Sequence, residues 1–242
     1  VQTKENSPGS LDISGTAMNL TDNLAALTVE DKTTLAGSTV YFYDENNQAE
    51  KYNTADYRTI TTNDLDASDT NELFMRTNAN GVYGQSAGND KITSTNTVTG
   101  SGTYNITVFD QGMRNGYNNA AGADTKGHLD QDVVLIENAD KDGTYNIKEM
   151  KYDNGVWAYE YEGKADIVDD GLNLTQVTTR AATQSSAQMA AQDASKIAAG
   201  AAVTLFGADE TLMERLGDVR NSADDNDGVW AKYVGGKIKV DG

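Results

Sequence analysis

The chain has 242 residues, with 19 Lys and Arg against 37 Asp and Glu, and a formal net charge of −18. This acidic balance argues against a nucleic-acid-binding protein, because phosphate recognition draws its affinity from clustered Lys and Arg. Cysteine is absent, which excludes a disulfide framework, a thiolate metal site and a Cys nucleophile. No stretch reaches the roughly 20 apolar residues of a membrane helix, and residues 1–9 lack a signal peptide's apolar segment. We therefore expect an internal fragment of a longer protein.

The first 170 residues predict many short strands. Runs of Val, Ile, Leu, Tyr and Thr alternate with clusters of Asn, Asp and Gly, which is typical of strands joined by tight turns. Helical periodicity is almost absent there, so the pattern predicts an all-β fold. The runs are Leu11–Ile13, Ala26–Val29, Ser38–Tyr43, Tyr57–Ile60, Glu72–Arg76, Lys91–Thr95, Thr103–Phe109, Asp132–Ile136, Thr144–Met150 and Val156–Tyr161.

A five-residue motif occurs twice within these strands. Gly102–Ile106 reads Gly-Thr-Tyr-Asn-Ile, and Gly143–Ile147 repeats it 41 positions later. This spacing equals about two turns of a solenoid whose turns hold roughly 20 residues. The alternative is chance similarity between two hairpins. Since one residue separates the Tyr from the Ile in each copy, both should face the core. These predicted core residues are Tyr104, Ile106, Tyr145 and Ile147.

From Asn173 onwards the composition becomes that of a helix. Thr175–Arg220 is rich in Ala, Gln, Ser and Met and contains no Pro. Large side chains are sparse in its first half, whereas Leu212–Val219 has apolar residues at i, i+3 and i+4 spacing. A break near Gly207 would divide the segment into two helices. After an acidic turn, Val229–Val234 predicts a final strand.

The order of these segments resembles a known family of bacterial proteins, the type V autotransporters. Asn71–Thr77, Asn89–Ile92 and Gly100–Tyr104 are similar to the family's autochaperone segment, with its Asp-Lys-apolar strand and its Gly-x-Gly-x-Tyr strand. Leu212–Arg220 followed by Gly228–Lys232 looks like the pore helix that leads into the first strand of the translocator barrel.

The resemblance covers residues 60–242 and extends to residues 1–60 only by composition. The chain stops inside the first barrel strand, so this fragment is not expected to perform transport. The helix also lacks the Asn-Asn pair at which some members are cleaved.

This resemblance implies a right-handed parallel β-helix with autochaperone-like turns at its C-terminal end, followed by an α-helical linker. It divides the chain into passenger turns at 1–60, an autochaperone-like region at 61–172, a linker helix at 173–221 and a truncated barrel strand at 222–242. It implies a location at the cell surface, secreted or anchored at the bacterial outer membrane. The implied partners are the protein's own C-terminal barrel, the barrel assembly machinery and a host or cell-surface ligand of the upstream passenger.

Two functions fit these observations. The first is a non-catalytic stalk and folding module of a surface adhesin, because a terminal segment that orders first offers a template to slowly folding parallel strands. The second is a calcium-dependent adhesion or surface-layer binding module, which shares the acidic, Cys-free composition. The Ala-rich helix before a Trp strand favours the first, and we expect no enzymatic activity.

One segment has the spacing of a calcium loop. Residues with side-chain oxygen atoms occupy positions 1, 3, 5 and 12 of the calcium-loop pattern, and the Gly that the pattern requires is at position 6. The flanking residues predict strands, whereas an EF-hand needs helices, and an Asp-Gly turn explains the same residues. We expect no cofactor and leave calcium as the one alternative. Its ligands would be Asn138, Asp140, Asp142 and Glu149.

The rest of the chain offers no catalytic constellation. His128 is the only histidine and lies in a predicted loop, and no Gly-x-Ser-x-Gly elbow occurs. Acidic pairs such as Asp169-Asp170 are expected from composition alone. Aromatic residues at alternating strand positions, Trp157 among them, should stack on the next strand rather than bind sugar. Trp230 is expected in the barrel strand, where aromatic residues meet the lipid interface.

Overall fold

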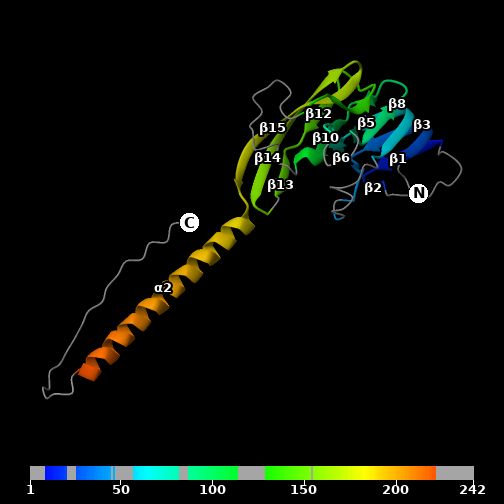
Figure 1. Cartoon of the computed structure of the whole chain (residues 1–242). Helices are drawn as coiled ribbons and strands as arrows, with labels where there is room; N and C mark the ends of the chain where they lie inside the picture. Colours follow the sequence, from blue (N-terminus) through cyan, green and yellow to red (C-terminus); the bar gives the residue numbers. More distant parts are fainter. Residues whose placement is uncertain are drawn as a thin grey trace. The chain divides into compact units, whose positions relative to one another are not determined.

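The computed structural model describes residues 9–20, 26–44, 46, 57–81, 87–113, 129–153 and 155–221, with side chains as far as Leu205. Strands make up most of this part, and one helix follows them (Figure 1). This confirms the prediction of an all-β fold with a C-terminal helix. The chain divides into two compact units, residues 1–154 with 158–183 and residues 155–157 with 184–242. Within the described ranges, no helix is both long enough and apolar enough to cross a bilayer.

From β1 to β12 the main strands alternate between two sheets, and within each sheet these strands pair in parallel. The first sheet contains, in spatial order, β1 (Ser10–Ser14), β3 (Ala26–Ala36), β5 (Thr59–Ser68), β8 (Lys91–Ser94) and β11 (Val133–Glu137). The second contains β2 (Ala17–Asn19), β4 (Thr39–Tyr41), β6 (Thr70–Asn78), β10 (Thr103–Asp110) and β12 (Thr144–Ile147). We call a first-sheet strand and the next second-sheet strand a layer. Two short strands, β7 (Gly88–Asn89) and β9 (Thr99–Gly100), pair with β6 and β5.

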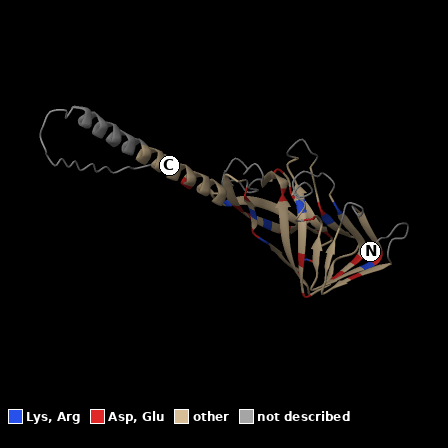
Figure 2. Ribbon diagram, turned by 90° about the horizontal axis from the view of Figure 1, so that it is seen from below, with Lys and Arg blue, Asp and Glu red and all other residues tan. Residues whose placement is uncertain are grey.

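The hydrophobic core consists of columns of side chains that repeat from layer to layer. In the first sheet, register places four aliphatic residues in one column, each at most 5% exposed: Leu27, Ile60, Ile92 and Ile136. In the second sheet, Val40, Leu73 and Ile106 form a column that is fully buried. Alternation along each strand sends the intervening polar residues outward. Figure 2 shows the basic and acidic residues interspersed along the strands.

Every run predicted as a strand in the first 170 residues overlaps an observed strand, but the spacing of the repeat was misread. Tyr104 pairs directly with Tyr145, so the two copies of the motif lie in adjacent layers. The 41 positions between the copies therefore span one layer and not two. Elsewhere in the second sheet, paired residues of adjacent layers are 33 positions apart, as Glu72 and Asn105 are, or 22 positions apart, as Ala17 and Thr39 are. The longer interval contains residues 111–132, which connect β10 to β11.

The resemblance implies a parallel β-helix as far as residue 172. In the described strands, however, parallel pairing ends at β11 and β12. The first sheet continues from β11 through β15 (Gly171–Gln184) and β14 (Trp157–Val168) to β13 (Met150–Asp153). β11 pairs antiparallel with β15, and β13 pairs antiparallel with β14. Asp169 and Asp170 join β14 to β15 with φ of 48° and 62°. Two positive φ angles are what a type I′ hairpin turn requires, and this turn explains the acidic pair.

The helix begins later than the predicted residue 173. Residues 173–184 belong to β15, and α2 runs without a break from Ser186 to Asn221, through Gly207. Three apolar residues of this strand are buried: Leu172, Leu174 and Val177. The Ala-rich composition of the longer segment favoured a helix and masked the strand pattern of these residues. Ser185 sets the start of the helix, because its Oγ accepts a hydrogen bond from the N–H of Gln188 at 3.1 Å. One internal Gly costs a helix only about 1 kcal/mol, which is too little to break it.

Candidate functional site

The charged residues that the strands bury most completely are Arg76 and Asp90. Arg76 lies in β6 and Asp90 directly precedes β8, and both side chains are 0% exposed. The guanidinium binds the carboxylate through two hydrogen bonds, from Nε to Oδ2 at 2.9 Å and from Nη2 to Oδ1 at 2.9 Å. Such bidentate pairs are the strongest hydrogen-bonded ion pairs that side chains form. The backbone N–H groups of Arg58 and Arg76 also donate to this carboxylate, each at 2.7 Å.

A second buried guanidinium extends this arrangement towards the N-terminal layers. Arg58 directly precedes β5 and is 2% exposed. Its Nη1 donates to the carbonyl oxygen of Leu20, which follows β2, and to that of Phe42, which follows β4, at 3.1 Å. Nη2 of Arg76 donates to the same Phe42 oxygen at 3.4 Å. Arg58, Arg76 and Asp90 are called the Asp90 cluster below.

Aromatic rings surround the cluster. The guanidinium carbon of Arg76 lies 5.8 Å from the ring centroid of Tyr43 and 5.7 Å from that of Tyr57, within the range of cation–π attraction. Tyr57 also packs directly on the backbone of Gly88, where an added Cβ would lie 2.6 Å from the ring. Aromatic faces thus take the place of water around the buried charge.

Burial governs the titration of the groups in and near the cluster. Burial raises the pKa of the Asp90 carboxyl, while the Arg76 guanidinium and two backbone N–H groups act in the opposite direction. Burial also raises the pKa of the Tyr57 hydroxyl to about 12. Asp110, at the end of β10, is fully buried, and its pKa rises to about 7 although the N–H of Gly112 donates to it at 2.9 Å. The Asp90 carboxylate is closed to solvent and surrounded by donors, which suits a structural clamp.

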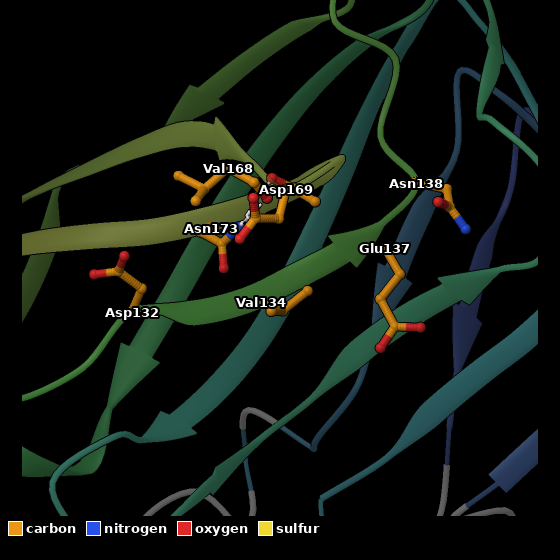
Figure 3. A pocket seen from close by; sticks show the side chains of 8 residues that line it. Asp132, Val134, Glu137, Asn138, Val168, Asp169 and Asn173 are labelled. Carbon is orange, nitrogen blue, oxygen red and sulfur yellow. Dashed lines mark hydrogen bonds between the residues drawn. The ribbon is translucent and has the colours of Figure 1, made fainter.

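Two cavities of about 410 and 400 Å³ flank β11. Asp132, Val134 and Glu137 line both of them, and residues at the turn between β14 and β15 also line the first. Figure 3 shows Asp132 and Glu137 of the first cavity directed away from one another. Glu137 accepts a hydrogen bond from Lys91 at 2.9 Å, and the Asn173 amide donates to carbonyls of its own turn. The side chains that line the cavity therefore do not converge on a common ligand position.

The residues predicted to face the core occupy paired positions in adjacent layers. Tyr104 and Tyr145 stack with ring centroids 5.2 Å apart and an interplanar angle of 16°. Tyr104 is 2% exposed and Ile106 is fully buried, whereas Tyr145 and Ile147 in the edge strand are half-buried against the core. Trp157 lies at the start of β14 and is 37% exposed. Trp230 and the predicted final strand lie outside the described residues.

The residues of the calcium-loop pattern hold a connection between two strands. The Asn138 amide donates to the Ser94 carbonyl at 2.5 Å, and Asp140 Oδ1 accepts from the N–H of Asp142 at 3.0 Å. Glu149 accepts a hydrogen bond from Arg180 at 2.6 Å. Among the described residues, no three His, Cys, Asp or Glu side chains are grouped as they would be around a metal. His128 lies outside the described part of the chain.

Sequence reasoning did not find the Asp90 cluster. Arg76 and Asp90 both fell within segments that were compared with autochaperone strands, but they are 14 positions apart and nothing in their spacing indicates a pair. A charged residue inside an otherwise apolar run, as at Arg76, was the available signal. The glycines of the Gly100–Gly102 motif have a geometric reason as well. A Cβ on Gly100 would lie 1.9 Å from the Ala67 carbonyl oxygen in the adjacent layer.

The geometry defines an all-β protein, built mainly of parallel strands and followed by a long helix. No family model matches its sequence, and no curated protein matches it. The functional argument therefore rests on the arrangement of the strands and on the Asp90 cluster.

Proposed function

We propose that residues 10–147 form a right-handed parallel β-helix in which each layer is one turn. The support is that the main strands from β1 to β12 alternate between two sheets and pair in parallel within each, with aliphatic columns in register; only the two-residue strands β7 and β9 interrupt the alternation. A chain that returns to the same sheet after each visit to the other winds as a coil of stacked turns. Right-handed crossing is the rule for parallel strands in one sheet, which favours this hand.

For this β-helix we infer the role of a non-catalytic stalk and folding module in the passenger of a surface-displayed autotransporter, secreted or anchored at the outer membrane. One observation carries the proposal. Antiparallel strands β15, β14 and β13 continue the first sheet beyond β11, while β1 and β2 pair with no further described strand on their other side. The C-terminal end of the first sheet thus has a local hairpin beside it, whereas β1 and β2 are the outermost described strands at the N-terminal end.

The physical logic of folding supports this role. Parallel turns pair residues far apart in sequence, so they fold slowly and expose strand edges while they do so. The hairpin formed by β14 and β15 needs only a two-residue connection, and such local contacts form early. A C-terminal segment that orders first offers a preformed edge on which upstream turns add one at a time.

Helix α2 fits a segment that acquires its partner in the parent protein. Every side chain from Ser186 to Leu205 is exposed or half-buried, including Met189, Ile197 and Leu205. We infer that this partner is the protein's own translocator barrel, inserted by the barrel assembly machinery. The ligand of the displayed adhesin would be recognised by the upstream passenger.

Deletion of residues 60–170 from the parent protein tests the proposal. The upstream passenger is expected to become protease-sensitive at the cell surface, while insertion of the barrel remains intact. The double variant Asp169→Asn/Asp170→Gly is the matched control, because it preserves a type I′ turn and should leave the passenger resistant. A shortened passenger that resists protease as well as the parent would refute the folding role.

A further inference from the structure

The Asp90 cluster connects four consecutive layers at one corner of the stack. Arg58 and Asp90 directly precede strands, where the chain enters the first sheet, and Arg76 lies near the C-terminal end of β6. The connected positions are the Leu20 carbonyl after β2, the Phe42 carbonyl after β4, Arg58 before β5, Arg76 in β6 and Asp90 before β8.

The contacts of the cluster link early layers of the stack to a residue that comes later in the sequence. Asp90 follows every one of its partners in sequence, so the N-terminal layers depend on a residue supplied by the fourth layer. Its carboxylate fixes Arg76 through the guanidinium and Arg58 through the backbone N–H. The two arginines in turn donate to carbonyls of the first and second layers. Without the carboxylate, the buried Arg76 guanidinium loses its counter-ion, and removing one partner of a buried ion pair is strongly destabilising.

We propose that Asp90 couples the folding of the two halves of the stack: layers one and two, β1 to β4, become stably ordered only when Asp90 clamps Arg76 and Arg58. The inference rests on the proposed folding role, because it names the residue through which the folded C-terminal turns stabilise the upstream turns. The coupling is confined to this cluster, because its side chains are buried and bind main-chain groups: N–H groups bind the Asp90 carboxylate, and carbonyl oxygens bind the arginines.

An exposed ion pair that also joins two neighbouring layers provides the matched comparison. Lys32 in β3 binds Asp66 in β5 at 2.7 Å, and thus also connects neighbouring layers, but these side chains are 43% and 37% exposed. Solvent screening makes such surface pairs contribute little. Asp66→Asn and Asp90→Asn are the same chemical change at an exposed and a buried interlayer pair.

Hydrogen exchange of the purified full chain, followed by mass spectrometry, tests the coupling. In Asp90→Asn, amides of β1 to β4 should exchange at least about a hundredfold faster than in the parent, while β10 to β15 keep their protection. Asp66→Asn should leave both regions within about threefold of the parent. An even loss of protection along the whole chain, complete unfolding included, would overturn the proposal, and so would an unchanged profile.

Arg58→Met provides an independent test that leaves no buried charge behind. This variant removes the donor to the Leu20 and Phe42 carbonyls but keeps the Arg58 backbone N–H that binds Asp90. Faster exchange confined to β1 to β4 is expected, and full protection there would contradict the coupling. Because the purified chain is used, failure here would remove the role of Asp90 and leave the cell-surface test of the folding module unaffected.

Discussion

Tyr104 and Tyr145 stack on one another at equivalent positions of adjacent layers, with ring centroids 5.2 Å apart. The two copies of Gly-Thr-Tyr-Asn-Ile are therefore neighbours in space, and the Asn105 and Asn146 side chains between them are hydrogen-bonded at 3.1 Å. In both copies of the motif, the Tyr and Ile side chains face the core and the Asn side chain faces outward.

Replacing Tyr104 with Ala should destabilise the protein by about 3 to 5 kcal/mol, because a ring that is 2% exposed leaves a cavity in the core. Tyr104→Phe is the control. The Tyr104 hydroxyl is buried and forms no hydrogen bond with the described residues, so its removal should be neutral or slightly stabilising. Urea denaturation of the three proteins measures both effects, and equal midpoints for Tyr104→Ala and the parent would place this ring outside the core.

Gly100→Ala should prevent the native packing of β9 on β5. The new Cβ would lie 1.9 Å from the Ala67 carbonyl oxygen, at a backbone φ of +97° that side chains rarely adopt. Gly15→Ala separates the two causes, since Gly15 also has a positive φ of +59° but no atom within 4 Å of its Cβ position. Thermal denaturation should show a loss of about 1 to 2 kcal/mol for Gly15→Ala and a much larger one for Gly100→Ala. Similar losses in the two variants would argue against a close approach at Gly100.

Asp110 should make the stability of the protein fall as the pH rises from about 4 to about 7. Its pKa is about 7 in the folded protein against 3.8 for the unperturbed group, so the folded state holds a proton that the unfolded state has released. The contribution is present below pH 4, decreases by at most about 1.4 kcal/mol per unit and is lost above pH 7. Asp110→Asn does not titrate, so the difference in unfolding free energy between variant and parent should follow this profile. A difference independent of pH would show that Asp110 titrates normally.

Removing calcium should leave the melting temperature unchanged. Asn138 and Glu149, the ends of the calcium-loop pattern, are engaged by the Ser94 carbonyl and by Arg180. Melting curves in EDTA and in millimolar calcium chloride test this, and Asp142→Asn in the same pattern serves as the control. Stabilisation by calcium in the parent that disappears in Asp142→Asn would favour the calcium-dependent adhesion module over the folding module.

The sequence alone determined the local structure of this protein. Alternation of apolar and polar residues located the strands, because a strand with one buried face must follow a period of two. Clusters of Asn, Asp and Gly located turns between the strands. The pair Asp169-Asp170, which we had attributed to composition, forms the turn of a hairpin that only the structure revealed. An Ala-rich composition located α2, although Leu174 and Val177 before it belong to a strand.

Only the tertiary structure decided which strands are neighbours and which polar residues are buried. The spacing of the repeat suggested two turns, because chain length within a turn varies with its loops and no local pattern records that length. Arg58, Arg76 and Asp90 were not singled out from the sequence, because burial of a charge depends on partners that are distant in sequence. Their pairing exists only after strands from four layers meet at one corner, where the cost of removing each charge from water is offset by the others.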